Sequence, residues 1–154
     1  MNVAGMASHP TDSDCIFCAI IAGDIPARIV GETDDAVAFL DVNPLAPGHT
    51  LVVPRGHYES VATTPTEQLT GVFDLLGRLT PDVEMAVDAD ASNLGINNGP
   101  ASGQEVPHLH AHIIPRFVDD GGRPIHAVGG DAPDLSEDEF DEITDRIVAR
   151  TQRD

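Results

Sequence analysis

The stretch His108-Leu109-His110-Ala111-His112-Ile113-Ile114-Pro115 is the most informative part of this chain of 154 residues. In a β-strand, successive side chains point to opposite faces. The three histidines would therefore line one face, about 7 Å apart, while Leu109, Ala111 and Ile113 pack on the core. Because the whole chain holds only seven histidines, this spacing predicts a functional row of imidazoles on a half-buried strand.

Two kinds of chemistry fit the row. Imidazoles two residues apart on a strand are good zinc ligands, and Cys15 and Cys18 form a CxxC pair upstream. In an intracellular protein, such a pair indicates metal binding or redox chemistry rather than a structural disulfide. A neutral imidazole is also a competent nucleophile near pH 7, and a neighbouring imidazolium stabilises negative charge on phosphate oxygens. A metal at one end of the row would leave two histidines free.

The charge of the chain excludes some partners. Twenty-six acidic residues face eight basic ones, giving a net charge of -18, and all eight bases are arginine. This charge disfavours nucleic acid and anionic lipid as partners, whereas a small phosphorylated ligand needs only a local positive pocket. The acidic, lysine-free surface suggests a hypothesis, namely that the chain comes from a halophile with an acidic proteome and a cytoplasm of very high salt. Compositional drift in a GC-rich genome is the alternative.

The length predicts one domain with a single core, at residues 14–154, after a flexible N-terminal tail at residues 1–13. The longest apolar stretch, around residues 15–22, is far shorter than the roughly 20 residues that cross a bilayer. The N-terminus also lacks a basic region followed by an apolar one. We therefore expect a soluble, cytoplasmic protein that binds no membrane.

Local patterns predict an α+β fold. Strand-like stretches lie at residues 28–32, 36–42, 49–54, 94–98 and 109–115. Helices are expected at residues 16–21, from Pro65 onward, and at about residues 136–152. Thr64 and Glu67 would cap the middle helix, Pro81 would kink or restart it, and Ser136 would cap the last one. Strands in hairpin order with helices set between them favour an antiparallel sheet.

Beyond the row, the sequence resembles the histidine-triad (HIT) superfamily of nucleotide hydrolases and transferases. The resemblance runs from Cys15 to Arg116, about two thirds of the chain, and fits the nucleoside phosphoramidase branch. It rests on residues 39–44 (FLDVNP), residues 46–54 (APGHTLVVP), Asn97, the pair Gly103-Gln104, and the row with its following IIPR. It implies a HIT-like fold with about five antiparallel strands, a central helix and a C-terminal helix. It also implies a homodimer.

The resemblance implies a role for each matched residue. His110 would be the nucleophile that forms a covalent nucleotidyl-histidine, and His112 and His49 would contact phosphate oxygens or the leaving group. Gln104 would hydrogen-bond near the transferred phosphate, and Asp41 would accept from the ribose hydroxyls. The other implied nucleotide-binding positions are Ile16, Phe17, Ile20 and Phe39 around the base, with Val42, Asn97 and Gly103. For the apolar positions, ordinary core packing is an equal alternative.

The resemblance also implies a metal. Superfamily members with an N-terminal CxxC carry a structural zinc, and the matched ligands are Cys15, Cys18, His57 and His108. Two thiolates and two imidazoles make a closed tetrahedral set, which suits a structural rather than a catalytic ion. A redox role for the two cysteines is the main alternative.

The implied activity is hydrolysis of nucleoside phosphoramidates or related nucleotidyl compounds, with a purine nucleotide such as AMP or GMP as product. The transferase branch replaces the third histidine by glutamine, so His112 favours hydrolysis. Glu105 stands where related sequences often have serine or threonine. Three alternatives are a dinucleoside polyphosphate hydrolase, a nucleotide-binding interaction or regulatory protein, and a metal-storage module that uses all the histidines.

Overall fold

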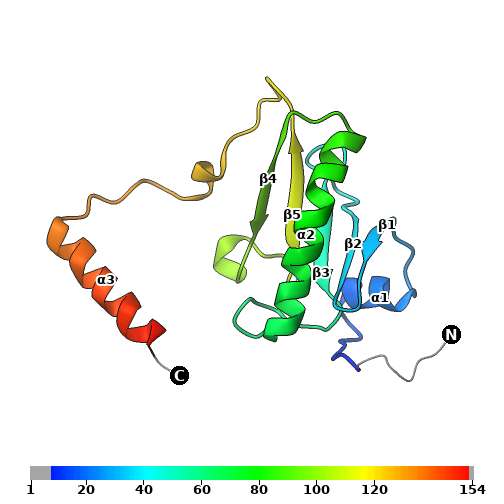
Figure 1. Cartoon of the computed structure of the whole chain (residues 1–154), viewed down its shortest axis with the longest axis horizontal. Coiled ribbons are helices and arrows are strands. Elements are labelled where there is room, and N and C mark those ends of the chain that lie inside the picture. Colours follow the sequence, from blue (N-terminus) through cyan, green and yellow to red (C-terminus); the bar gives the residue numbers. More distant parts are fainter. Residues whose placement is uncertain (1–7, 153–154) are drawn as a thin grey trace. The chain divides into compact units, whose positions relative to one another are not determined.

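The computed structural model describes residues 8–152 of the chain. Their strands form one antiparallel sheet with the order β1-β2-β3-β5-β4 (Figure 1). The strands are β1 (Ile29–Glu32), β2 (Ala36–Leu40), β3 (Thr50–Pro54), β4 (Ala91–Ile96) and β5 (Ala111–Arg116). The predicted α+β fold with about five antiparallel strands is confirmed. Strand β4 differs most from its expected bounds, because it begins at Ala91 rather than at residue 94 and ends at Ile96 rather than at residue 98. Residues 41, 42, 109 and 110 lie outside β2 and β5.

Helices cover both faces of this sheet. The long helix α2 (Thr66–Ala86) buries Val72, Leu75 and Leu76 against one face, where they meet Ala36, Ala38, Val52, Ala111 and Ile113 (Figure 1). The short helix α1 (Ile16–Ala22) packs Phe17 and Cys18 on the other face, against Val37, Phe39, Leu51 and Val53. Alternate residues of β2 and β3 thus enter different cores, as the period of two requires.

The same alternation sets the direction of the histidines. Ala111 and Ile113 face α2 and are fully buried, so His112 between them points to the side of α1. In β3, Val52 faces α2 while Leu51 and Val53 face α1. His112 lies opposite Leu51 in the ladder between β3 and β5. The sheet therefore gathers polar side chains of neighbouring strands on the side of α1.

Two of the helix ends predicted from the sequence are found in the structure, and a third is not. Helix α1 ends at Gly23, whose φ of +84° suits glycine. Helix α3 (Glu137–Thr151) begins after Ser136, whose hydroxyl accepts from the Glu139 amide at 3.2 Å. The predicted cap of α2 is wrong. Its first flanking residue is Pro65, and the Thr64 hydroxyl donates to the Ser60 carbonyl at 2.6 Å instead.

Pro81 does not restart the central helix, which runs unbroken from Thr66 to Ala86. The residue four positions earlier is Gly77, and no other part of the chain lies within 4 Å of the position its Cβ would take. Just before the proline, the Thr80 hydroxyl donates to the Leu76 carbonyl at 2.7 Å. Pro81 has no N–H to donate to the Gly77 carbonyl, so the helix continues past the proline without that hydrogen bond.

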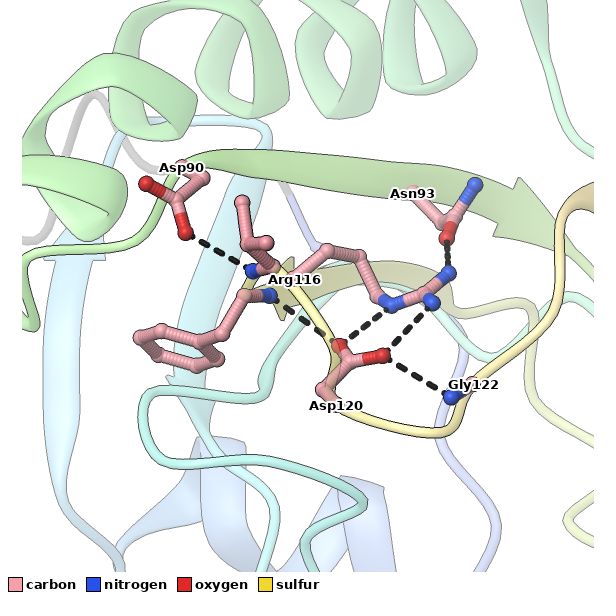
Figure 2. Close-up of polar contacts among 7 residues, drawn as sticks. Asp90, Asn93, Arg116, Asp120 and Gly122 are labelled. Atoms are coloured by element: carbon pink, nitrogen blue, oxygen red, sulfur yellow. Dashed lines mark hydrogen bonds and ion pairs between the residues drawn. The ribbon is translucent and has the colours of Figure 1, made fainter.

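A polar turn follows the end of β5 (Figure 2). The Asp120 carboxylate accepts from Arg116 Nε at 2.8 Å and from the Phe117 and Gly122 amides at 3.0 and 2.8 Å. The Arg116 guanidinium also donates to Asn93 of β4 at 2.6 Å. Hydrogen bonds from the arginine and the two amides lower the pKa of Asp120 well below its usual range. The turn therefore fastens the end of β5 to its neighbouring edge strand.

The described chain forms two compact units, one up to Gly122 and one from Arg123 onward. The second unit holds the short 3-10 turn η2 (Ile125–Val128) and helix α3, with no buried residue in either element. Phe140, Ile143 and Ile147 of α3 are exposed. The proposed limits of a single domain at residues 14–154 stay a prediction.

The predicted tail at residues 1–13 falls partly outside the described residues, which begin at residue 8. Nearer to α1, the Pro10 carbonyl accepts from the His57 amide at 2.8 Å, and the Asp12 carbonyl accepts from the Cys15 amide at 3.1 Å. Pro10 and Asp12 are thus hydrogen-bonded to the rest of the first unit. Among the described helices, none combines the length and the apolar character needed to cross a bilayer.

Candidate active site and metal site

His110 presents one free ring nitrogen. Its Nδ1 lies 2.8 Å from the main-chain carbonyl of His108. A carbonyl only accepts, so Nδ1 carries the hydrogen, and in the neutral ring Nε2 keeps its lone pair. The ring is buried at 8% exposure and packs edge-on against Phe17, with 5.1 Å between the ring centroids. The residue thus has the tautomer that a nucleophile attacking through Nε2 requires.

A chain of hydrogen bonds fixes the tautomer of His112. The Leu45 amide donates to His49 Nδ1 at 3.1 Å, so the neutral His49 ring carries its hydrogen on Nε2. That nitrogen lies 2.9 Å from His112 Nδ1, which must therefore accept. The hydrogen of a neutral His112 is left on Nε2. This atom is the one buried side-chain nitrogen or oxygen without a partner among residues 8–152.

The geometry of the row corrects one expectation. Strand β5 begins at Ala111, so His108 and His110 lie before the ladder rather than within a strand. The ring centroids of His110 and His112 are only 5.0 Å apart. The irregular backbone at residues 108–110 brings the His108 carbonyl to the His110 ring. In a regular strand, this carbonyl would bond to a neighbouring strand instead.

Burial keeps most of the row uncharged. The pKa of His112 is lowered to about 4, mainly by burial and also by His110 and His49, while Asp41 acts in the opposite direction. Burial likewise lowers the pKa of His49, with Asp41 again opposing. An imidazole with a pKa near 4 is neutral at pH 7. His112 therefore offers a phosphate a neutral N–H donor, not the imidazolium that the sequence had suggested.

A second cluster brings together Cys15, Cys18, His57 and His108, whose ligand atoms all lie within 4.8 Å of one another. His108 Nδ1 lies 3.4 Å from Cys15 Sγ and 3.6 Å from Cys18 Sγ. His57 Nδ1 lies 3.4 Å from Cys18 Sγ. Bonds of about 2.3 Å to sulfur and 2.0–2.1 Å to nitrogen in a tetrahedron place such ligand atoms about 3.5 Å apart. The cluster therefore matches the donor set and the size of a zinc site.

The hydrogen bonds of His108 support this assignment. Its Nε2 lies 3.0 Å from the Pro54 carbonyl, so Nε2 carries the hydrogen and Nδ1 directs its lone pair at the two thiols. A metal-bound histidine commonly donates its other N–H to a carbonyl in this way. Burial lowers the pKa of His108 to about 4 and raises that of Cys15. A bound cation would favour the thiolate.

The set Asp41, His49 and His112 also lies close enough to hold a metal ion. Its hydrogen bonds favour another use. His49 Nε2 is the donor to His112 and faces Asp41 Oδ2 at 3.7 Å. To bind a metal, this nitrogen would have to lose its hydrogen, and the Leu45 amide would lose its acceptor. The hydrogen bonds of this set therefore favour a polar network over a second metal site.

Gln104 braces the loop before the row. Its amide oxygen accepts from the Gly99 amide at 2.8 Å, and its amide nitrogen donates to the carbonyls of Glu59 and Val106 at 2.8 and 3.0 Å. The whole side-chain amide is thus engaged with main-chain groups. A direct bond from Gln104 to phosphate stays a prediction, and it requires one of these bonds to open.

The structure separates the predicted nucleotide-binding residues by exposure. Phe17 and Phe39 are 7% and 3% exposed and pack against each other with centroids 5.4 Å apart, so they serve mainly as core. Ile16 and Val42 are 49% and 78% exposed and offer apolar surface to a ligand. Ile20 is half-buried against the same core cluster. Their roles in base binding stay predictions.

Asp41 and Asn97 lie at the ends of their strands. Asp41 follows β2, and its main-chain amide donates to the His49 carbonyl at 2.9 Å. Asn97 follows β4, is exposed, and has its side-chain nitrogen 3.8 Å from the position that a Cβ of Gly103 would take. The structure thus places Asn97 beside Gly103, and Asp41 beside two of the histidines.

Two contributors were missed from the sequence. The Leu45 amide orients His49 through its main chain, so its side chain gives no signal. Phe17 was predicted only as an apolar residue near the base, and its contact with the His110 ring was not foreseen.

A cavity of about 310 Å³ lies away from the three rings. Its lining includes His57, Tyr58 and Gln104 but none of His49, His110 and His112.

Several known proteins are similar to this chain. The HIT domain matches residues 22–119. An uncharacterized HIT-like protein of Methanocaldococcus jannaschii is 47% identical over 107 residues, which cover 70% of this chain and 82% of that protein. The adenosine 5'-monophosphoramidase HNT1 of Saccharomyces cerevisiae is 34% identical over 92% of this chain and 85% of its own.

Among solved structures, a zinc-bound histidine triad family protein from Mycobacterium smegmatis is 31% identical. Its TM-score is 0.67, and the match covers 90% of this chain and 95% of that one.

Proposed function

Because the chain belongs to the HIT domain family, we propose that it is a nucleotide hydrolase that works through a covalent nucleotidyl-histidine on His110. The observation that carries this proposal is the pairing of two ring nitrogens. His110 Nε2 has a free lone pair, and His112 Nε2 carries a buried hydrogen without a partner. Their rings are 5.0 Å apart between centroids. A nucleophile and a hydrogen-bond donor thus lie side by side.

In the first step, His110 Nε2 attacks the α-phosphorus of the nucleotide. The new bond joins Nε2 to phosphorus, and the bond from phosphorus to the leaving group breaks. The neutral His112 Nε2–H donates a hydrogen bond to the leaving nitrogen or oxygen, which takes up a proton from solvent as it departs. Splitting the displacement into two easier steps is the advantage of covalent catalysis.

In the second step, water attacks the same phosphorus, releases a proton to solvent and frees the nucleoside monophosphate. The His110–phosphorus bond breaks, and Nε2 of His110 regains its lone pair. His112 Nε2 keeps its hydrogen throughout, because the relay from the Leu45 amide through His49 holds one tautomer of His112.

Cys15, Cys18, His57 and His108 would hold a structural zinc ion. With all four positions filled by protein ligands, the ion would tie α1 to the residues before β5. The chain's own histidines perform every step at phosphorus.

For the substrate, we favour nucleoside phosphoramidates that release AMP or GMP. The yeast relative named as an adenosine 5'-monophosphoramidase supports this class. His112, rather than glutamine, at the third position of the row favours water over a sugar phosphate as acceptor. A dinucleoside polyphosphate hydrolase is the second candidate, because the same donor serves an oxygen leaving group. Relative kcat/KM for adenosine phosphoramidate and diadenosine polyphosphates decides between them.

We also propose a homodimer. Strand β4 forms one edge of the sheet, and its Leu94 is 41% exposed. An open edge strand offers unpaired main-chain groups to a second copy. Light scattering should give twice the mass of the chain, and a monomer at micromolar concentration would contradict this part of the proposal.

The decisive experiment is to trap the intermediate. A rapid quench of the enzyme with labelled adenosine phosphoramidate should show one adenylyl group on His110 by peptide mass spectrometry. His110→Ala should abolish the adduct and lower kcat by several orders of magnitude, while nucleotide binding persists. The matched control is His126→Ala, in the exposed turn η2, which should keep full activity. Turnover in His110→Ala at the wild-type rate would refute the proposal and favour a binding or regulatory role.

A further inference from the structure

His108 belongs to both clusters of the first unit. Its ring directs Nδ1 at the two thiols, at 3.4 and 3.6 Å. Its main-chain carbonyl accepts from His110 Nδ1 at 2.8 Å. The same residue thus supplies a predicted metal ligand and the acceptor that sets the tautomer of the nucleophile. Its side chain is fully buried, so its ring and its peptide cannot move independently by much.

Phe17 makes a second link between the two clusters. It sits in α1 between Cys15 and Cys18, and its ring packs edge-on against both His108 and His110, with centroids 5.8 and 5.1 Å apart. The two cysteines that flank it would be held by the metal. The position of the Phe17 ring therefore depends on the four metal ligands, and the His110 ring packs against the Phe17 ring.

From these contacts, we propose that the metal cluster positions the nucleophile, and that Phe17 is a positioning residue for His110. This inference rests on the proposed function. When no metal holds the four ligands together, the His108 carbonyl and the Phe17 ring are free to shift. His110 can then place its hydrogen on Nε2, where the lone pair is needed, and its ring can turn away from the line of attack.

A different role for Phe17, as the wall of the base pocket, predicts another outcome. A residue that contacts the base contributes to binding of the nucleotide before and during the reaction, so its loss raises the Kd. A residue that orients the nucleophile contributes to the chemical step and leaves nucleotide affinity unchanged. The exposed fraction of Phe17, 7%, favours the second role.

The first test is Phe17→Leu, which keeps an apolar side chain and both cysteines. We expect full metal content, an AMP Kd within about twofold of wild type, and a rate of His110 adenylylation about ten- to a hundredfold lower, the usual cost of a misplaced reacting group. The matched control is Val37→Ala in the same buried cluster, which should lower stability and leave the adenylylation rate unchanged. A raised Kd with an unchanged rate would overturn the proposal.

The second test needs no activity. Nitrogen-15 NMR of the wild-type imidazoles, recorded before and after metal removal with a chelator, should show His110 with its hydrogen on Nδ1 only while the metal is bound. A His110 tautomer that persists without metal would overturn the proposal. If one protein sample unfolds, the other test still decides. Failure of the proposed function looks different, because the wild type itself would then form no adduct.

Discussion

His49 gives the sharpest prediction of the mechanism, because it touches the reaction only through His112. Its ring is 2% exposed and is held by the Leu45 amide at 3.1 Å and by His112 Nδ1 at 2.9 Å. In His49→Ala, nothing donates to His112 Nδ1. The hydrogen of His112 is then free to occupy Nδ1, and Nε2 loses the hydrogen bond that it donates to the leaving group.

The size of the effect follows from the lost hydrogen-bond donor. Removing one donor that stabilises charge in the transition state costs about 10²–10³ in kcat. We expect kcat for adenosine phosphoramidate to fall about a hundredfold, since part of the His112 population keeps its hydrogen on Nε2. The Leu45 amide and His112 Nδ1 also lose a partner, at about 1 kcal/mol each. The free energy of unfolding should therefore decrease, and kcat must be measured well below the melting temperature.

The assay compares two leaving groups. A departing amine is a strong base and needs a hydrogen-bond donor at its nitrogen, whereas p-nitrophenolate is a weak base and departs without one. His49→Ala should therefore be slow on the phosphoramidate and nearly normal on the p-nitrophenyl ester of AMP. His126→Ala, far along the chain in an exposed turn, should leave both rates unchanged. Equal losses on both substrates would refute the relay and leave His49 as a plain phosphate contact.

Three other predictions concern stability. The pKa of His112 is about 4 in the fold and 6.5 as the ordinary value, so its neutral burial should contribute full stability above pH 6.5 and progressively less toward pH 4; urea unfolding across this range checks the sign. Cys18→Ser should lose the metal and lower Tm by about 10 °C or more, and His108→Ala should lower Tm further than His110→Ala does. With a net charge of -18, Tm should rise from dilute buffer to molar potassium chloride as salt screens repulsion; a constant Tm would remove the halophile hypothesis.

Much of the fold was predictable because it depends on local patterns. Ala111 and Ile113 alternate with histidines, and a period of two already places them in the core, where they are fully buried. Ser136 and Glu139 mark the start of α3 through a side chain that caps the adjacent turn. At Thr64 the same kind of pattern failed, because another local hydrogen bond competed with it. The Thr64 hydroxyl donates to the Ser60 carbonyl, four residues earlier, and does not cap α2.

The hydrogen bonding of the site was not predictable from residues alone. His49 and His112 are 63 positions apart, and their contact depends on the register of β3 against β5, which pairs Leu51 with His112. Register is set by packing on both faces of the sheet and not by any one segment. The tautomer of His110 depends on an irregular backbone before β5 that alternation alone would have made regular.

The Asp120 turn after β5 separates the bonding of the first unit from the segment that follows it. The carboxylate accepts from the Phe117 and Gly122 amides, so the first unit ends in a closed set of hydrogen bonds. The hydrogen bonds described for His49, His110 and His112 involve no residue after Gly122. A chain that ends soon after Gly122 should therefore keep the tautomers of all three rings.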